Sequence, residues 1–361
     1  MKKTTAILCT FLLGTITLCG QDAKETAYNK AMEAVGLMDE GKIAESRQLL
    51  QEAIKLDNKF TYRYEVAYSY YISQDYKTAI KLLEKERKCP DLTQRYFQLL
   101  GNSYDVTGKT KKALDTYEEG LKKFPNSGMI ILEEGNTYWN KKEYEKALPY
   151  YEKGIELDPR YPTNYYRASL LFCKASTEEV WGMIYGEIFM NLERNSERTA
   201  EISKLLYDTY KSEIKLDGDN MSVSFCKQMT IYVDPKNKDQ KPKLPFCMVY
   251  EPTLTMALAP VMLSKIIDIN SLDKVRSSFV EQYYKMGHDT TYPNALFSYQ
   301  KKVLDAGHME AYNHWILMKG DEDAFIRWRN DNKEKWEKFI AWFAENKLEL
   351  NDKNKFYRTQ Y

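Results

Sequence analysis

The sequence predicts an all-α protein in which helical hairpins repeat along the first part of the chain and a helical module with a small β-hairpin follows. Three observations favour this fold. Identical residues recur 34 positions apart, apolar residues within each repeat recur every three or four positions, and glycine or proline stands where each helix has to end. The matched pairs are Gly101 and Gly135, Tyr104 and Tyr138, Ala113 and Ala147, Tyr117 and Tyr151, Gly120 and Gly154, and Pro125 and Pro159.

One repeat, residues 94–127, illustrates how two helices arise. Gly108 interrupts the first helix, and Pro125 ends the second because proline cannot donate the next backbone hydrogen bond. The first helix face carries Phe97, Leu100, Gly101 and Tyr104, and the second carries Ala113, Leu114, Tyr117, Gly120 and Leu121. This pattern indicates a helical hairpin.

Small and large residues alternate in this hairpin. Gly101, Ala113 and Gly120 leave room for two helices to approach closely, and Tyr104 and Tyr117 are large enough to fill the adjacent space. We therefore expect the tyrosines to pack beside the small residues.

A 34-residue hairpin with these landmarks resembles a tetratricopeptide repeat. Two copies match it clearly. Two weaker copies lie upstream, one 34 residues earlier and one a further 33, and a modified fifth lies downstream. Their marker residues are Ala67, Tyr70, Ala79 and Leu83; Ala34, Leu37, Ser46, Leu50 and Ala53; and Ser169, Phe172, Trp181, Tyr185 and Ile188.

Large residues replace small ones in the fifth copy, which suggests that another part of the chain packs against it. Ser196 then caps a helix with one polar face, as the end of such an array requires. We expect the superhelix to cover residues 21–216.

The first twenty residues have the layout of a secretory signal peptide. Lys2 and Lys3 precede an apolar run that is too short to span a bilayer. We expect cleavage before Gln21 and an exported protein, periplasmic or associated with the cell envelope. Lipidation at Cys19 is the alternative, although Leu18 is larger than the residue that normally precedes a lipidated cysteine.

The charge balance argues against a nucleic-acid partner. The chain has 53 basic and 52 acidic side chains, so the excess of positive charge that nucleic acids require is absent. No other apolar stretch is long enough to span a bilayer, so we do not expect an integral membrane protein.

Cys226 and Cys247 lie near each other in the sequence, each inside an apolar run. An oxidising compartment would allow them to form a disulfide, and burial as free thiols is the alternative.

The remaining residues, 217–350, predict a mainly helical module. Residues 222–233 and the segment LPFCMVY are expected to form a small hairpin. Helices are expected from Ser271 to Gly287, from Pro293 to Gly307, and over the aromatic-rich run 321–347. The polar residues 351–361 are expected to fray.

No motif indicates an enzyme, a metal site or a cofactor. The histidines are His288, His308 and His314, and none has metal-ligand spacing. His288 follows Gly287, where a helix ends, and is expected in a solvated loop.

The family resemblance implies binding instead. In tetratricopeptide repeats the first helix of each hairpin lines a groove that holds peptides or partner helices. The positions carried over are Arg95, Gln98, Asn102, Asp105, Leu132, Asn136, Trp139, Asn140 and Tyr166, with Val106 beside them. The resemblance therefore implies a non-enzymatic scaffold for a protein or peptide partner.

Two alternatives stay open. The asparagines would instead bond to the neighbouring helix while Trp139 simply packs, or the many tyrosines would bind a glycan by stacking on its rings. The lysine and arginine pattern by which some family members hold a chaperone tail is missing.

Overall fold

The computed structural model describes residues 12–217, 220–226 and 244–360, and nearly all regular structure there is α-helical. The all-α prediction is therefore confirmed. The chain divides into two compact units, residues 1–125 and 126–361. The first part of the expected signal segment, residues 1–11, lies outside the described residues.

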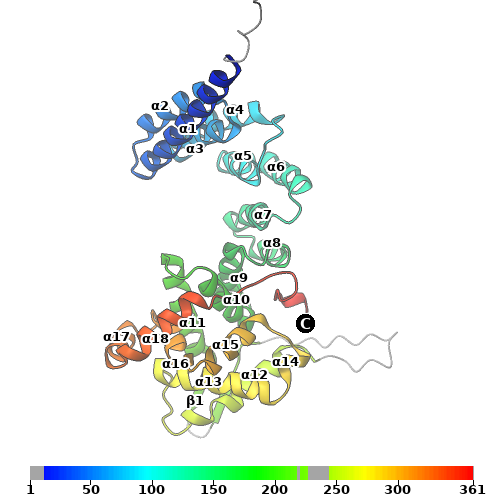
Figure 1. Ribbon diagram of the computed structural model, residues 1–361. Coiled ribbons are helices and arrows are strands. Elements are labelled where there is room, and N and C mark those ends of the chain that lie inside the picture. The colour runs from blue at the N-terminus through cyan, green and yellow to red at the C-terminus, as the bar shows by residue number, and fades with distance from the viewer. Residues whose placement is uncertain (1–11, 218–219, 227–243, 361) are drawn as a thin grey trace, which may run out of the picture. The chain divides into compact units, whose positions relative to one another are not determined.

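The first unit consists of three successive helical hairpins, α1 with α2, α3 with α4, and α5 with α6 (Figure 1). The bounds of these helices are α1 (Leu12–Asp39), α2 (Ile43–Leu56), α3 (Phe60–Ile72), α4 (Tyr76–Glu86), α5 (Gln94–Val106) and α6 (Thr110–Lys123). Gly108 follows α5 with a φ of 75°, a left-handed conformation that glycine adopts at little cost. The predicted break between the two helices of this repeat is therefore confirmed.

The predicted packing of small against large residues is present in this hairpin. A Cβ atom added at Gly101 would lie 2.0 Å from Cε1 of Tyr117, so only glycine allows α5 and α6 to approach this closely. The tyrosine ring itself is only 1% exposed.

The second unit begins with two more hairpins, α7 with α8 and α9 with α10, and continues into the C-terminal helices. Its elements are α7 (Gly128–Asn140), α8 (Tyr144–Leu157), α9 (Pro162–Ala175), α10 (Glu179–Leu192), α11 (Glu197–Glu213), β1 (Ile214–Asp217), β2 (Asn220–Val223), α12 (Cys247–Ala257), α13 (Ile269–Lys285), α14 (His288–Thr291), α15 (Ala295–Asp305), α16 (Met309–Leu317), α17 (Glu322–Asp331), α18 (Lys333–Glu345) and the short 3₁₀ helices η1 (Ala259–Val261) and η2 (Arg358–Gln360).

Helix α10 lies at the centre of the second unit. Its residues from Glu179 to Asn191 are all buried, as expected for a helix that has no polar face. Partners from α13, α15 and α16 reach it, which confirms that another part of the chain packs on the modified fifth repeat. One hydrophobic core continues from Leu132 to Phe356, across the boundary expected after residue 216.

Helix α11 begins after Ser196 as predicted, and the Ser196 hydroxyl accepts a hydrogen bond from the Thr199 amide. Its polar face, which includes Lys204 and Asp208, is exposed. Helix α11 nevertheless does not end the packed helices, because α16 also contacts it.

The β-hairpin is present but uses different residues. Strands β1 and β2 pair antiparallel, with Ile214 opposite Val223. The segment LPFCMVY was expected to be a strand, and this prediction is wrong because it enters α12. Cys247, Tyr250 and Leu254 are spaced by three and four and all face the core, which is a helical rather than a strand pattern. The rest of the expected strand and loop, residues 227–243, lies outside the described residues.

Cys226 and Cys247 form a disulfide, with their Cα atoms 6.1 Å apart. The pairing that the sequence left open is therefore present. It links the segment after β2 to the first residue of α12.

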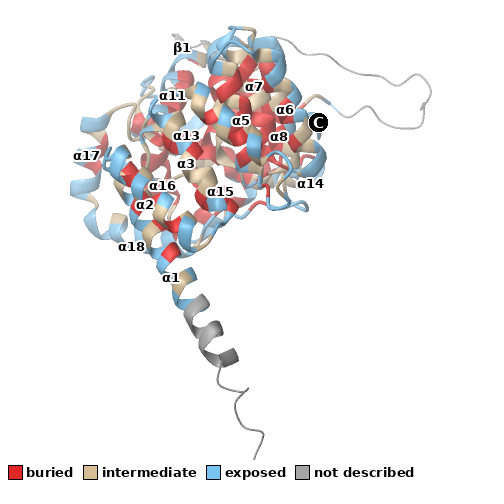
Figure 2. Cartoon of the chain, turned by 90° about the horizontal axis from the view of Figure 1, so that it is seen from above, coloured by how far each residue is buried: buried red, intermediate tan, exposed pale blue. Residues whose placement is uncertain are grey.

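Two helix boundaries differ from expectation. Asp268, not Ser271, caps α13, and Ser271 is the third helical residue, whose hydroxyl accepts from the Asp268 amide in a capping box. The run 321–347 divides into α17 and α18 at Asn332. Each of these helices buries one narrow face, and Figure 2 shows α17 mostly exposed.

The C-terminal segment, expected to fray, is packed instead. Phe356 is 1% exposed and its ring stacks on Trp181. Arg358 donates to both carboxylate oxygens of Glu152, at 2.9 and 2.8 Å, and to Glu178 at 3.2 Å. These contacts hold the segment against α8 and α10.

Candidate functional site

A groove of about 390 Å³ opens on the first unit. Its walls come from the first helix of each of the three hairpins, which is the face that the sequence pattern had selected. The lining residues are Val35 of α1; Tyr64, Glu65, Tyr68 and Tyr71 of α3; and Arg95, Gln98, Leu99 and Asn102 of α5. Three of the predicted positions therefore lie together in this groove: Arg95, Gln98 and Asn102.

The tyrosines of α3 share one helix face because they lie four and three positions apart. The rings of Tyr64 and Tyr68 are nearly parallel, with an interplanar angle of 5° and centroids 6.5 Å apart. Tyr68 is 37% exposed, so part of its ring is open to solvent. Ala67 of the same helix is buried and packs into the core.

The groove contains one acid and one base that do not form an ion pair. Within the described part of the chain, no carboxylate lies within 4.0 Å of the Arg95 guanidinium, and no side-chain donor bonds to Glu65. Burial raises the pKa of Glu65, and the positive charge of Arg95 partly opposes that shift. The groove thus presents both charges to a ligand.

Asn102 uses one of its two polar atoms inside the protein. The Tyr117 hydroxyl donates to Asn102 Oδ1, and the same bond recurs one repeat later from Tyr151 to Asn136, at 3.1 Å. Asn136 also donates to Glu133, at 2.9 Å. Bonding to the neighbouring helix, the alternative left open by the sequence, is therefore correct for both asparagine oxygens. Among the described residues, the Asn102 amide nitrogen makes no hydrogen bond, so this donor is available to a ligand.

Asp105 does not line the groove. Its carboxylate accepts from the Thr110 hydroxyl, at 3.3 Å, near the turn that joins α5 to α6. Val106 beside it is 55% exposed at the end of α5.

The other predicted positions belong to the second unit. Leu132 is only 3% exposed and is part of the core, and Asn140 is exposed at the end of α7. Trp139 packs edge-to-face on Tyr144, and the Arg167 guanidinium lies 4.8 Å from its ring centroid. Trp139 therefore packs within its own unit, as the alternative interpretation proposed.

Tyr166, the last of these positions, is also engaged within the second unit. Its hydroxyl donates to Glu201 at 2.6 Å, and the Arg198 guanidinium lies 5.1 Å from its ring centroid. A continuous groove through all nine positions stays a prediction.

Sequence reasoning missed the α3 wall of the groove. Tyr64 and Tyr68 lie 34 residues before Gln98 and Asn102, so the same repeat positions, carried one copy upstream, would have identified both. Tyr71 lies 34 residues before Asp105, which the pattern also selected, so it would have been identified in the same way. Glu65 has no such signal, because its equivalent in the next copy is Leu99, which the pattern did not select.

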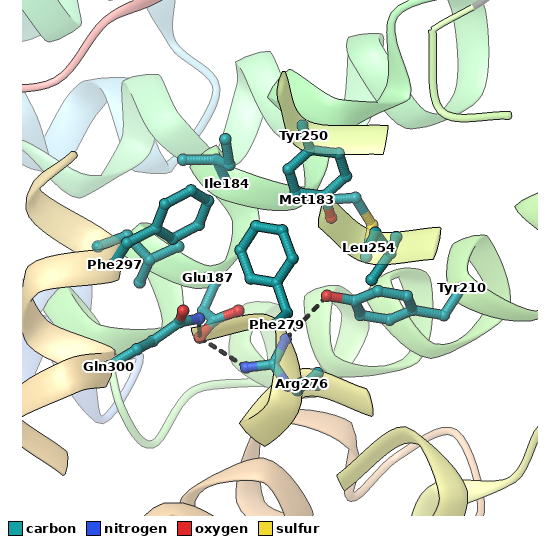
Figure 3. A pocket seen from close by; sticks show the side chains of 11 residues that line it. Met183, Ile184, Glu187, Tyr210, Tyr250, Leu254, Arg276, Phe279, Phe297 and Gln300 are labelled. Atoms are coloured by element: carbon teal, nitrogen blue, oxygen red, sulfur yellow. Dashed lines mark hydrogen bonds and ion pairs between the residues drawn. The ribbon is translucent and has the colours of Figure 1, made fainter. Parts of the chain in front are cut away.

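A second polar site lies buried in the second unit (Figure 3). Arg276 of α13 donates to Glu187 of α10, at 2.7 Å, and to the Tyr210 hydroxyl, at 3.1 Å. Gln300 and Tyr312 also donate to Glu187, at 2.6 and 2.8 Å. Burial disfavours the charged form of Arg276, but attraction to Glu187 outweighs it and raises the pKa of Arg276 further.

This second site is structural. The cavity beside the ion pair measures about 20 Å³, which holds a single water molecule and no larger ligand. Its polar groups already bond to each other, and they connect α10 to three C-terminal helices. Removing one partner would leave a buried charge unpaired.

The described residues contain neither a cluster of metal-ligating side chains nor a helix that could span a membrane. No group of three or more histidine, cysteine, aspartate or glutamate side chains is placed to hold a metal ion. Over the same residues, the helices lack any stretch with the length and apolar character of a membrane span.

The comparisons with known proteins identify the repeat. The model of the tetratricopeptide repeat family matches residues 133–161, which include all of α8. The chain therefore contains a tetratricopeptide repeat, as its sequence pattern predicted. No curated protein matches the chain.

Solved structures with similarity to the chain include three repeat proteins. YrrB, a tetratricopeptide repeat protein with an unusual peptide-binding site, is 18% identical over 50% of this chain and 94% of its own, with a TM-score of 0.32. MamA from Desulfovibrio magneticus RS-1 is 17% identical over 48% of this chain and 97% of its own, with a TM-score of 0.36. The TPR2AB domain of yeast Sti1, in its complex with pHSP90, is 17% identical over 52% of this chain and 84% of its own, with a TM-score of 0.25.

Proposed function

We propose that this protein is a non-enzymatic scaffold that binds a peptide segment of a protein partner in the groove of the first unit. The observation that carries the proposal is the groove itself, where Tyr68 offers an exposed ring. Within the described residues, the Arg95 guanidinium and the Asn102 amide nitrogen are donors that form no hydrogen bond. Aromatic and arginine side chains dominate the energetics of protein recognition. An amide donor suits the carbonyl groups of an extended peptide backbone.

Selection from a displayed library of random nine-residue peptides, with residues 21–361 as bait, tests this proposal. Enriched peptides are then titrated by fluorescence anisotropy against the parent and the double variant Tyr68→Ala, Arg95→Ala. We expect affinity to fall at least about tenfold in this variant, because it removes two anchoring side chains. The control Tyr28→Ala, Lys122→Ala removes an equally large exposed ring and one charge from elsewhere in the same unit.

Failure to enrich any peptide, or equal affinity of parent and groove variant, would contradict the proposal. A glycan array probed with the same protein tests the runner-up. If the parent binds a glycan but no peptide, and Tyr68→Ala loses the glycan binding, the groove binds a sugar and not a peptide.

We further propose that the protein is exported. The signal layout of residues 1–20 supports this, as does the disulfide between Cys226 and Cys247, because such bonds persist mainly in oxidising compartments. N-terminal sequencing of the purified native protein is expected to begin at Gln21. A lipid-modified Cys19 would instead indicate anchoring in a membrane, and an unprocessed Met1 would contradict export.

A further inference from the structure

We propose that the groove of the first unit contains a subsite for a basic side chain, formed by the Glu65 carboxylate and the rings of Tyr64, Tyr68 and Tyr71. The inference rests on the proposed function and names the chemistry of the partner: a peptide that places a lysine or arginine at this point. The subsite lies on α3 and shares the groove with the α5 positions that the sequence pattern had selected.

Geometry places these four side chains on one wall. Residues 64, 65, 68 and 71 lie on one side of α3, because their spacings of one, four and seven positions keep them within one arc of the helix. All four line the same groove. Its volume of about 390 Å³ falls within the range of roughly 300–1,000 Å³ that ligand pockets occupy.

Within the described residues, Glu65 makes no ion pair, although the positive charge of Arg95 in the same groove acts on it. Elsewhere in the first unit half-buried carboxylates are matched, as Glu86 is by Arg63 at 2.9 Å and Glu84 is by Arg87 at 3.1 Å. Glu65 is half-buried, yet it takes part in no hydrogen bond or ion pair within the described residues. A partly desolvated carboxylate of this kind gains most from a cation that reaches it through the groove.

The tyrosines favour a cation over a neutral group. The face of an aromatic ring carries negative electrostatic potential, so a lysine or arginine head placed over it is attracted. Tyr64 and Tyr68 present nearly parallel rings, and Tyr68 is partly open to solvent. A basic side chain would therefore meet ring faces along its stem and the carboxylate at its head.

Saturation-transfer difference NMR tests the subsite with two small probes, Nα-acetyl-lysine methylamide and Nα-acetyl-norleucine methylamide. They have similar stems, and only the first carries a charge. We expect the parent protein to bind the lysine probe about tenfold more tightly than the norleucine probe. Glu65→Gln should reduce lysine binding to the norleucine level, and Tyr68→Leu should weaken it, whereas Tyr68→Phe, which keeps the ring face, should retain it.

Glu118→Gln is the matched control, because it removes the same charge from an exposed position on α6. It should bind the lysine probe as the parent does. Circular dichroism melting of each variant establishes that it is folded. Equal binding of the two probes by the parent, or unchanged lysine binding in folded Glu65→Gln, would overturn the subsite.

The peptide selection separates this outcome from failure of the proposed function. Peptides that bind the groove but contain no recurring lysine or arginine would leave the function standing and overturn the subsite. Lysine binding without any peptide binding would support the subsite and contradict the peptide-binding function.

Discussion

At the residue scale, the repeats depend on glycines that lie against tyrosine rings. Gly101 faces Tyr117 in the first unit, and Gly135 faces Tyr151 in the second, where an added Cβ would lie 2.6 Å from the ring. The same tyrosines donate hydrogen bonds to Asn102 and to its repeat equivalent. In each repeat the tyrosine therefore both packs on the glycine that sets the helix spacing and donates a hydrogen bond to the asparagine beside it.

Gly101→Ala should destabilise the first unit by about 1–3 kcal/mol, because the added methyl overlaps the Tyr117 ring. Gly36→Ala is the control, since a Cβ there meets no atom within 4 Å and alanine is the better helix former. Thermal unfolding followed by far-UV circular dichroism measures both. A Gly101→Ala protein that melts at or above the parent temperature would contradict this packing.

His314 gives the stability of the second unit a pH dependence. Its ring stacks on Trp328 with centroids 4.1 Å apart and is 1% exposed. Burial lowers the pKa of His314 despite the nearby Asp273 carboxylate. A group whose pKa is lower in the folded than in the unfolded state stabilises the fold above its unfolded pKa of roughly 6.5. That contribution is lost as the pH falls through the folded value.

His314→Phe keeps a ring against Trp328 and removes this titration. We therefore expect its stability relative to the parent to rise between pH 8 and pH 5. Urea denaturation followed by tryptophan fluorescence measures it, because all six tryptophans lie in the second unit. A difference between the two proteins that does not change with pH would show that protonation of His314 does not affect folding.

At the scale of elements, the C-terminal segment acts as an additional layer on the repeats. Residues 351–360 contain little regular structure, yet Phe356 fills a site between Trp181 and Tyr185. The Lys355 ammonium donates to the Glu156 carbonyl of α8, at 2.9 Å, and the Arg358 amide donates to the Tyr185 hydroxyl of α10, at 2.8 Å. These bonds tie the segment to α8 and α10.

Phe356→Ala should lower the stability of the second unit by about 3 kcal/mol, since it leaves a cavity beside Trp181. Lys353→Ala, at an exposed position of the same segment, should have no measurable effect. Urea denaturation followed by tryptophan fluorescence compares the two. Equal stability of Phe356→Ala and Lys353→Ala would mean that the segment is held by other contacts.

Some elements were predictable from the sequence and others were not, for physical reasons. The hairpins were predictable, because periodic spacing of apolar residues and helix breaks at glycine or proline are local signals. The strand expected at LPFCMVY was wrong because a short apolar run fits either a strand or a buried helix. The packed tail was missed because its contacts are remote in sequence, as Arg358 and Glu152 lie 206 positions apart.

The groove was predictable in part. The α5 wall followed from the family pattern in the best-matched copy. The α3 wall was missed because the upstream copy replaces the expected amides with tyrosines, as Tyr68 stands where Asn102 stands one repeat later. That Glu65 is half-buried without an ion pair, among the described residues, follows only from three-dimensional packing.

At the scale of the whole molecule, the two units differ in what holds them. The first unit consists of repeats alone. In the second unit the repeats share a hydrophobic core with the C-terminal helices, and a disulfide adds a covalent link. The disulfide closes a loop of 21 positions, and a cross-link of that span stabilises a fold by about 3 kcal/mol.

The double variant Cys226→Ser, Cys247→Ser should therefore shift the tryptophan-detected urea transition by about that free energy. Cys89→Ser, which changes a free thiol in the first unit, should leave this transition in place. If reducing agent shifts the parent transition no more than that of the double variant, the disulfide contributes nothing to folding stability.

The groove of the first unit is proposed to bind the partner. Photo-crosslinking tests it most directly: a selected peptide carrying a benzophenone is irradiated with the parent protein, and the attachment sites are mapped by mass spectrometry. We expect crosslinks on α3 and α5, near Tyr68 and Asn102, that disappear in the double variant Tyr68→Ala, Arg95→Ala. Crosslinks confined to residues 126–361 would contradict it.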